Sequence, residues 1–247
     1  MPLARTRNIA LSPNAELYVD AGFASAADAR AAGIEIGTPI VYAPRAIALA
    51  CERIGGTSVD DRAGCAVLVQ AAKALAPRSD RPTVHFVFSV QEEFNLRGAL
   101  VAAQALQPDI AIQLDLMLAT DTPDMAPRGE VALGGGPAMS LYSFHGRGTL
   151  NGTLPHPALV KLFERCAKTE GLVLQRSAQV GVLTDSSYVQ LVGQGVASID
   201  VGFPCRYTHS SLEVCDLGDL AGLTQLLVAA VCSVDRGFPL NRDLSDP

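Results

Sequence analysis

The chain has 247 residues, of which 49% are hydrophobic and 18% are charged. This composition is typical of a compact globular protein, and it excludes both a disordered chain and a very small scaffold that needs disulfides or metals to fold. Because the net charge is −6 and the Lys and Arg residues are scattered, no basic surface for phosphates is expected, and nucleic acid is excluded as a partner.

The cysteine pattern and the apolar segments predict the cellular location of the protein. Six cysteines occur without a CxxC pair or a regular spacing, so we expect reduced, mostly buried thiols and neither a disulfide framework nor a structural zinc site. The N-terminal segment MPLARTRNIALSPN lacks the apolar stretch of a secretion signal. The longest uncharged apolar stretch, residues 220–234, is too short to span a bilayer. We therefore expect a soluble, cytoplasmic protein with no membrane contact.

The first 45 residues predict a small β-rich unit with one helix. Short strands are predicted over residues 16–22 and 37–42. Between them, Ser25 is a suitable N-cap for a helix, and Gly33 is a suitable stop at its C-terminus. Residues 46–247 form the larger predicted domain.

Strands and helices alternate from Asp60 onward. Helices are predicted over residues 61–76, 96–106, 157–170, 185–192 and 217–234. Strands are predicted over residues 83–90, 109–119, 172–175 and 196–202, with a glycine-rich turn at 134–136. The strands are nearly continuous apolar runs, as expected when both faces of a sheet are covered. The pattern predicts an α/β fold, a three-layer α/β/α sandwich with a mixed sheet.

Acidic residues and a histidine follow these strands. Glu92 and Glu93 come just after one predicted strand, and Asp115 ends the apolar run of the next. His209 follows the last strand, and Asp60 and Asp61 precede the first helix of the larger domain. Because ligands bind beyond the carboxyl ends of strands in open α/β sheets, we expect these side chains to converge on one rim.

A metal would explain this concentration of carboxylates. Like charges a few ångströms apart raise each other's pKa and cost stability unless a cation compensates them. Carboxylates and an imidazole are ligands that zinc, cobalt or manganese accepts, and two bridged metals would activate a water and polarise a scissile carbonyl. Because adjacent side chains at a strand end point different ways, one of Glu92 and Glu93 would bind metal while the other acts as general base.

Each of these residues also has an ordinary structural explanation. Paired acids before a helix usually cap it, paired glutamates after a strand usually lie in a solvated loop, and a lone histidine is usually a surface residue. Only their coincidence at consecutive strand ends favours the metal site. We assign no role to His85, His145 or His156. A serine hydrolase, a phosphate loop and a dinucleotide site are excluded, because GxSxG, a Lys-Ser/Thr after GGGPAM and the glycine spacing are all missing.

Several segments together resemble the glutamyl, or tetrahedral, aminopeptidases of metallopeptidase family forty-two. In chain order they are TSVDDRAGCAVL, VHFVFSVQEEFNLRGA, DIAIQLDLMLATDTP, GGGPAM, LTDSS and PCRYTHSSLEV. The resemblance covers nearly the whole chain from ELYVDAGFAS onward. It implies a metal-dependent aminopeptidase that removes N-terminal residues from short peptides with metal-activated water.

The resemblance also implies roles for individual residues. Asp60 would bridge two metals and precede a cis peptide, and Glu92 would be the general base. Glu93 and His209 would bind one metal, and Asp115 would bind the other. The metals would be zinc or cobalt, up to two per subunit.

At the level of the fold, the resemblance implies a zinc-peptidase-like catalytic domain at 46–247. Residues 1–45 would be the remnant of a small PDZ-like domain used for dimerisation. Homo-oligomers from dimers to dodecamers would follow.

The chain departs from the family pattern at one point. Family members carry an H-x-D motif ahead of the small domain, whose His completes the second metal site, whereas this chain has no histidine before His85. We therefore hypothesise one competent metal site and one weak site, and an exposed strand edge where the missing segment would add to the sheet. The alternative is a catalytically impaired or truncated homologue that acts as a non-enzymatic subunit. A sugar-active hydrolase is disfavoured, because only 5% of residues are aromatic and none is Trp.

Overall fold

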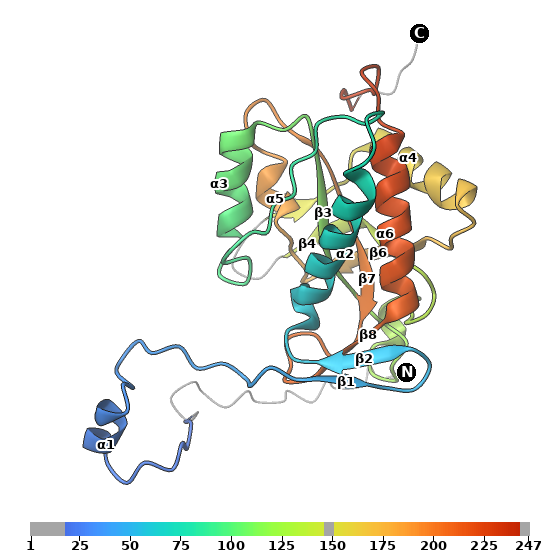
Figure 1. The fold of residues 1–247 in the computed structure, drawn as a ribbon. Helices are drawn as coiled ribbons and strands as arrows, with labels where there is room; N and C mark the ends of the chain where they lie inside the picture. Colours follow the sequence, from blue (N-terminus) through green and yellow to red (C-terminus); the bar gives the residue numbers. More distant parts are fainter. Residues whose placement is uncertain (1–17, 146–150, 243–247) are drawn as a thin grey trace, which may run out of the picture. The chain divides into compact units, whose positions relative to one another are not determined.

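The computed structural model describes residues 18–145 and 151–242 (Figure 1). The chain divides into two compact units, Met1–Tyr42 and Ala43–Pro247. In the first unit, helix α1 (Ala26–Ala31) begins at Ser25, whose side chain accepts a hydrogen bond from the backbone N–H of Asp28. Gly33 follows the helix with a positive φ of 84°, which suits a glycine stop. The predicted helix is confirmed.

The prediction of two strands flanking this helix is wrong for the residues that the structure describes. Residues 18–22 and 37–42 form no strand, and residues 16–17 lie outside the described part of the chain. Tyr18 and Val41 are 87% and 83% exposed. A strand is stable only when it pairs with another and buries one face, and neither condition holds here.

The second unit contains a small antiparallel sheet that the sequence pattern did not predict. It consists of β1 (Ala46–Ala48), β2 (Arg53–Gly56) and β8 (Glu213–Asp216), in the order β1-β2-β8. Gly56 pairs with Glu213, and a Cβ at Gly56 would lie 2.9 Å from the carbonyl oxygen of Arg45. Only a residue without a side chain permits this close approach.

The main sheet is mixed, as predicted. Strand β3 (Ile110–Leu118) runs parallel to β7 (Ala197–Cys205), which pairs antiparallel with β4 (Ala138–Phe144). Strand β4 pairs in parallel with β6 (Gln175–Val180) and antiparallel with the short β5 (Gly152–Thr153). Every residue of β7 is buried, which agrees with its continuous apolar sequence.

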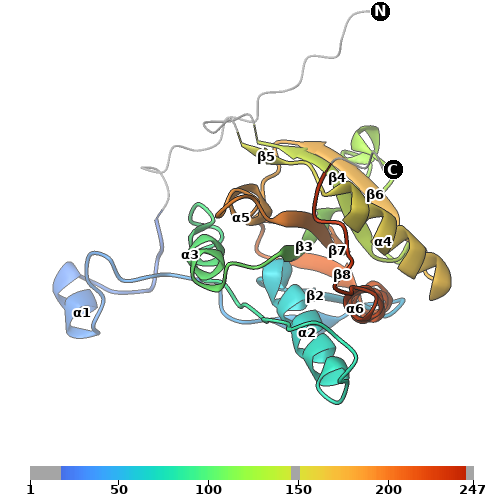
Figure 2. The same cartoon turned by 90° about the horizontal axis from the view of Figure 1, so that it is seen from above.

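Helices cover both faces of this sheet (Figures 1 and 2). Three helices pack on one face: α2 (Val59–Leu75), α4 (Pro157–Thr169) and α6 (Leu217–Cys232). On the other face, α5 (Ser186–Val189) contacts β3 and β7, and α3 (Arg97–Leu106) packs against α5. The predicted three-layer α/β/α sandwich is therefore confirmed.

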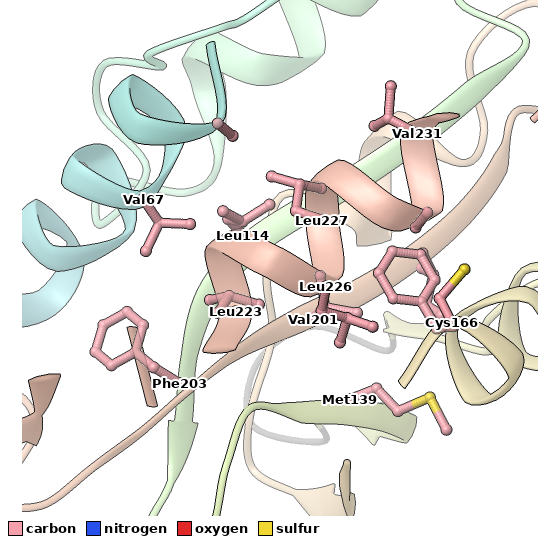
Figure 3. Packing of buried hydrophobic residues seen from close by; sticks show 14 of the residues in the cluster. Val67, Leu114, Met139, Cys166, Val201, Phe203, Leu223, Leu226, Leu227 and Val231 are labelled. Carbon is pink, nitrogen blue, oxygen red and sulfur yellow. The ribbon is translucent and has the colours of Figure 1, made fainter. Parts of the chain in front are cut away.

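The core lies between the sheet and the helices α2, α4 and α6. Val67 of α2, Leu226 of α6, and Val201 and Phe203 of β7 belong to one buried cluster (Figure 3), and each of these residues is at most 2% exposed. Burial of each such side chain contributes about 1.5–3 kcal/mol. All six cysteines are unpaired, and three of them are buried.

Three predictions in this unit need correction. Residues 83–90 form no strand, although Val84 and Phe86 still pack against the core from partly buried positions. An apolar run becomes a strand only when a neighbouring strand accepts its hydrogen bonds, and within the described residues β3 pairs only with β7. The strand predicted at 172–175 begins only at Gln175, as β6, and the helix predicted at 185–192 is shortened to α5.

A short 3-10 helix, Ala126–Arg128, completes the assigned elements. Of the helices in the described ranges, none is long and apolar enough to cross a membrane.

Candidate metal centre

The first residues of α2 place Asp60 at the rim of the sheet. Ser58 has a positive φ of 57°, Asp60 and Asp61 have non-helical backbone angles, and the regular helix begins after them. The peptide bond between Asp60 and Asp61 is cis, as the resemblance implies. The side chain of Asp60 is 9% exposed, and its Oδ2 accepts a hydrogen bond of 3.2 Å from Thr208.

Three predicted ligands come together at this position. His209 Nε2 lies 3.2 Å from Asp60 Oδ2 and 3.3 Å from Glu93 Oε2, and all three ligand atoms lie within 4.8 Å of one another. In a tetrahedral zinc site with ligand distances of about 2.0–2.1 Å, neighbouring ligand atoms are separated by about 3.3 Å. The spacing and the chemistry of these donors therefore fit a divalent metal.

The site is closed on one side and open on the other. The side chains of Glu93 and His209 are 60% and 69% exposed, in contrast to that of Asp60. A metal and a substrate could therefore approach from the side of Glu93 and His209 without movement of the core.

Glu92 has a different environment from Glu93. It is partly buried and is not among the three grouped ligand residues. Its pKa is raised to about 8, first by burial and then by the charges of Glu93, Asp185 and Asp60. A carboxylate that binds protons near neutral pH and stands beside the ligands suits a general base.

The pKa of Asp60 itself is raised to about 6. Burial is the largest cause, and the charge of Glu93 adds to it, whereas His209 and the hydrogen bond from Thr208 lower it. A bound cation would relieve this repulsion, because it favours the charged form of the carboxylates.

Asp115 lies within β3 rather than beyond its end, and it is not one of the grouped ligands. Its Oδ1 accepts a hydrogen bond of 2.7 Å from the N–H of Leu116. Its pKa is raised well above the ordinary value by burial, followed by the charges of Asp61, Asp60 and Glu92. The predicted role of Asp115 as a ligand of a second metal therefore stays a prediction.

Asp61 has no specific role in the sequence-based prediction. Burial, together with the charge of Asp60, raises its pKa to about 8. Its Oδ1 accepts a hydrogen bond from the N–H of Gly64, where a Cβ would lie 2.3 Å from Asp61 Oδ2. The glycine three positions after Asp61 is the sequence signal that could have drawn attention to this residue.

Glu213 is a residue that sequence reasoning missed. It is only 3% exposed, and its carboxylate accepts hydrogen bonds from the backbone N–H groups of Asp60 and His209, each at 2.9 Å. Its position in PCRYTHSSLEV, four residues after His209, is the one signal in the sequence.

The comparisons with known proteins agree with the family resemblance and with the fold. Residues 4–226 match the family model of the M42 glutamyl aminopeptidases, and the chain belongs to this family. A putative aminopeptidase, SgcX, of Escherichia coli strain K12 is 36% identical over 94% of this chain, which spans 62% of that relative's length.

Solved structures show the same fold. Aminopeptidase APDkam598 from the archaeon Desulfurococcus kamchatkensis is 30% identical, with a TM-score of 0.79 over 87% of this chain and 59% of its own. The Pyrococcus horikoshii TET1 peptidase, described as assembling into a tetrahedron or a large octahedral shell, is 26% identical, with a TM-score of 0.68. The match covers 78% of this chain and 54% of that one.

Proposed function

We propose that this chain carries the catalytic centre of a metal-dependent aminopeptidase that removes N-terminal residues from short peptides. The observation that carries the proposal is the convergence of Asp60, Glu93 and His209 at the spacing of a metal site, with Glu92 beside them. Membership of the M42 family and likeness to aminopeptidases support the same reaction.

Asp60, Glu93 and His209 would hold zinc or cobalt, which would supply a water of lowered pKa and polarise the scissile carbonyl. Glu92 would take the proton from the attacking water and deliver it to the leaving amine. The open side of the centre, formed by Glu93 and His209, would admit the free end of a peptide.

A second metal would have only Asp60 and Asp115 from the predicted ligands. Two protein ligands bind a metal more weakly than three, so one tight and one weak zinc equivalent are expected in a titration of metal-free protein. Two equally tight equivalents would contradict this part of the proposal.

The cytoplasmic location and the homo-oligomer predicted from the sequence belong to the same proposal. The structural likeness to a peptidase that can assemble into a tetrahedron or a large octahedral shell supports self-association. Light scattering on purified protein would measure the molar mass in solution. A monomer at all concentrations would contradict the proposed homo-oligomer.

The test combines metal analysis with hydrolysis of aminoacyl-p-nitroanilides by the wild type and by Glu92→Gln. We expect metal-dependent cleavage that falls by about 10²–10⁴-fold in the variant while metal content is unchanged. Glu130→Gln, which alters an exposed glutamate outside the grouped ligands, is the matched control and should behave as wild type. Bound metal without cleavage in the wild type would instead support a non-enzymatic homologue.

A further inference from the structure

One buried carboxylate holds the backbones of two proposed metal ligands at once. Glu213 Oε2 accepts the N–H of Asp60 and Glu213 Oε1 accepts the N–H of His209, each at 2.9 Å. The side chain uses both oxygens, and the two ligands that it joins come from opposite ends of the domain sequence.

The small sheet explains how Glu213 reaches both ligands. Strand β8 begins with Glu213 and pairs with β2, whose last residue, Gly56, lies opposite Glu213. The chain leaves Gly56 and reaches Asp60 within a short loop, so a residue 153 positions away in sequence becomes its neighbour. The sheet thus brings the two ligand-bearing loops together at one carboxylate.

The loop that carries His209 is closed on itself. The N–H of Arg206 donates to the carbonyl oxygen of Val214 at 2.9 Å, and the N–H of Val214 donates back at 3.1 Å. Within this loop Tyr207 and His209 have positive φ values of 61° and 59°. Residues other than glycine stay in this conformation only when surrounding contacts hold them there. For His209, the hydrogen bond to Glu213 is such a contact.

Burial makes these hydrogen bonds difficult to replace. Glu213 is 3% exposed, so water cannot take over if a partner is lost. A carboxylate that accepts two N–H groups also makes stronger bonds than a neutral acceptor of the same size.

We propose that Glu213 is a positioning residue of the metal centre. It sets the separation of the Asp60 and His209 side chains by holding both backbones, and it is not itself one of the grouped ligands. The inference rests on the proposed function, because it concerns the same site. Partners that orient metal ligands in this way typically change metal affinity by about 10–100-fold when they are removed.

The test measures zinc affinity by competition with a chelator for the full chain and its variants. Glu213→Gln keeps the size of the side chain but places an amide N–H₂ against a backbone N–H, and we expect a loss of about tenfold or more. Glu213→Asp keeps the charge but is too short to reach both ligands, and we expect a smaller loss. The aspartate variant also provides the measurement if the glutamine variant does not fold.

Asp216→Asn is the matched control. Asp216 lies on the same strand, is 8% exposed, and accepts the N–H of Gly218 at 2.9 Å, but it bonds to neither ligand. If the role of Glu213 were purely structural, both Glu213 variants would have a lower melting temperature, but their zinc affinity would not fall more than that of the control. Zinc affinity within twofold of wild type in both Glu213 variants, or an equal loss in the control, would overturn the inference. A wild type that binds no zinc would instead refute the proposed function itself.

Discussion

Arg206 and Asp121 form a two-point ion pair between the segment after β7 and the segment after β3. Arg206 Nε lies 2.7 Å from Asp121 Oδ1, and Arg206 Nη2 lies 2.6 Å from Oδ2. Asp121 also accepts the N–H of Leu133 at 3.0 Å. Because Arg206 begins the loop that carries His209, this pair anchors one side of the candidate metal centre.

Replacing Arg206 with Ala should lower the free energy of unfolding at pH 7 by about 1 kcal/mol, the upper range for partly exposed pairs. The hydrogen bonds from Arg206 lower the pKa of Asp121 below its ordinary value of 3.8. Between the lowered pKa and 3.8, the unfolded state therefore binds more protons than the folded state. The stabilisation from the ion pair is present above pH 3.8 and is lost as pH falls through the lowered pKa of Asp121. Urea unfolding of wild type and variant should thus converge in strong acid.

Much of the fold could be predicted because its signals are local. The helix from 157 begins with Pro157. The continuous apolar run of β7 indicates a strand covered on both faces, and β3 and β4 do pair with it. Residues 83–90 carry an equally apolar pattern but form no strand, because pairing depends on what lies beside the segment. Strand β4, which contains serines and follows a glycine turn, carries no clear alternation and was missed.

The candidate site likewise has residues that local signals predict and one that depends on distant contacts. Asp60, Glu93 and His209 are side chains at element ends, where topology alone predicts that ligands gather. Glu213 accepts a backbone hydrogen bond from a residue 153 positions away, and no residue pattern encodes such a contact. The contact depends on the pairing of β2 with β8, and strands of four residues each are too short to be predicted from sequence.

His209→Ala should separate metal binding from stability. The side chain of His209 is 69% exposed, so its removal should change the free energy of unfolding of the metal-free protein by no more than about 0.5 kcal/mol. Zinc affinity should fall by about 100-fold or more, because one of three protein ligands is lost. Calorimetric zinc titration measures the affinity, and His85→Ala, an exposed histidine outside the grouped ligands, is the control. Unchanged zinc affinity in the His209 variant would remove this residue from the site.

Substitution of Gly202 by Ala should test how tightly β3 and β7 approach beside Asp115. A Cβ at Gly202 would lie 1.7 Å from the carbonyl oxygen of Asp115, which is a backbone atom that cannot rotate away. We expect a loss of about 3 kcal/mol or more, because overpacking against a paired strand forces the backbone to shift. Thermal unfolding measures it. Gly171→Ala, a glycine with no atom within 4 Å of its added Cβ but with a positive φ of 66°, should cost only about 1 kcal/mol.

The stability of the metal-free protein should fall as pH rises through neutrality. The pKa values of Asp60, Asp61 and Glu92 are raised to about 6, 8 and 8, mainly by burial, from ordinary values of 3.8, 3.8 and 4.5. Between the ordinary and the raised pKa values, the folded state binds more protons than the unfolded state. The contribution of these three carboxyl groups to the free energy of unfolding is therefore complete below about pH 4 and is lost as pH rises towards 8. Zinc bound at the proposed site would compensate the charged carboxylates, so the rise in melting temperature on its addition should be larger at pH 8 than at pH 5.5. A melting temperature of the metal-free protein that increases steadily from pH 5 to pH 8 would contradict this account of the rim.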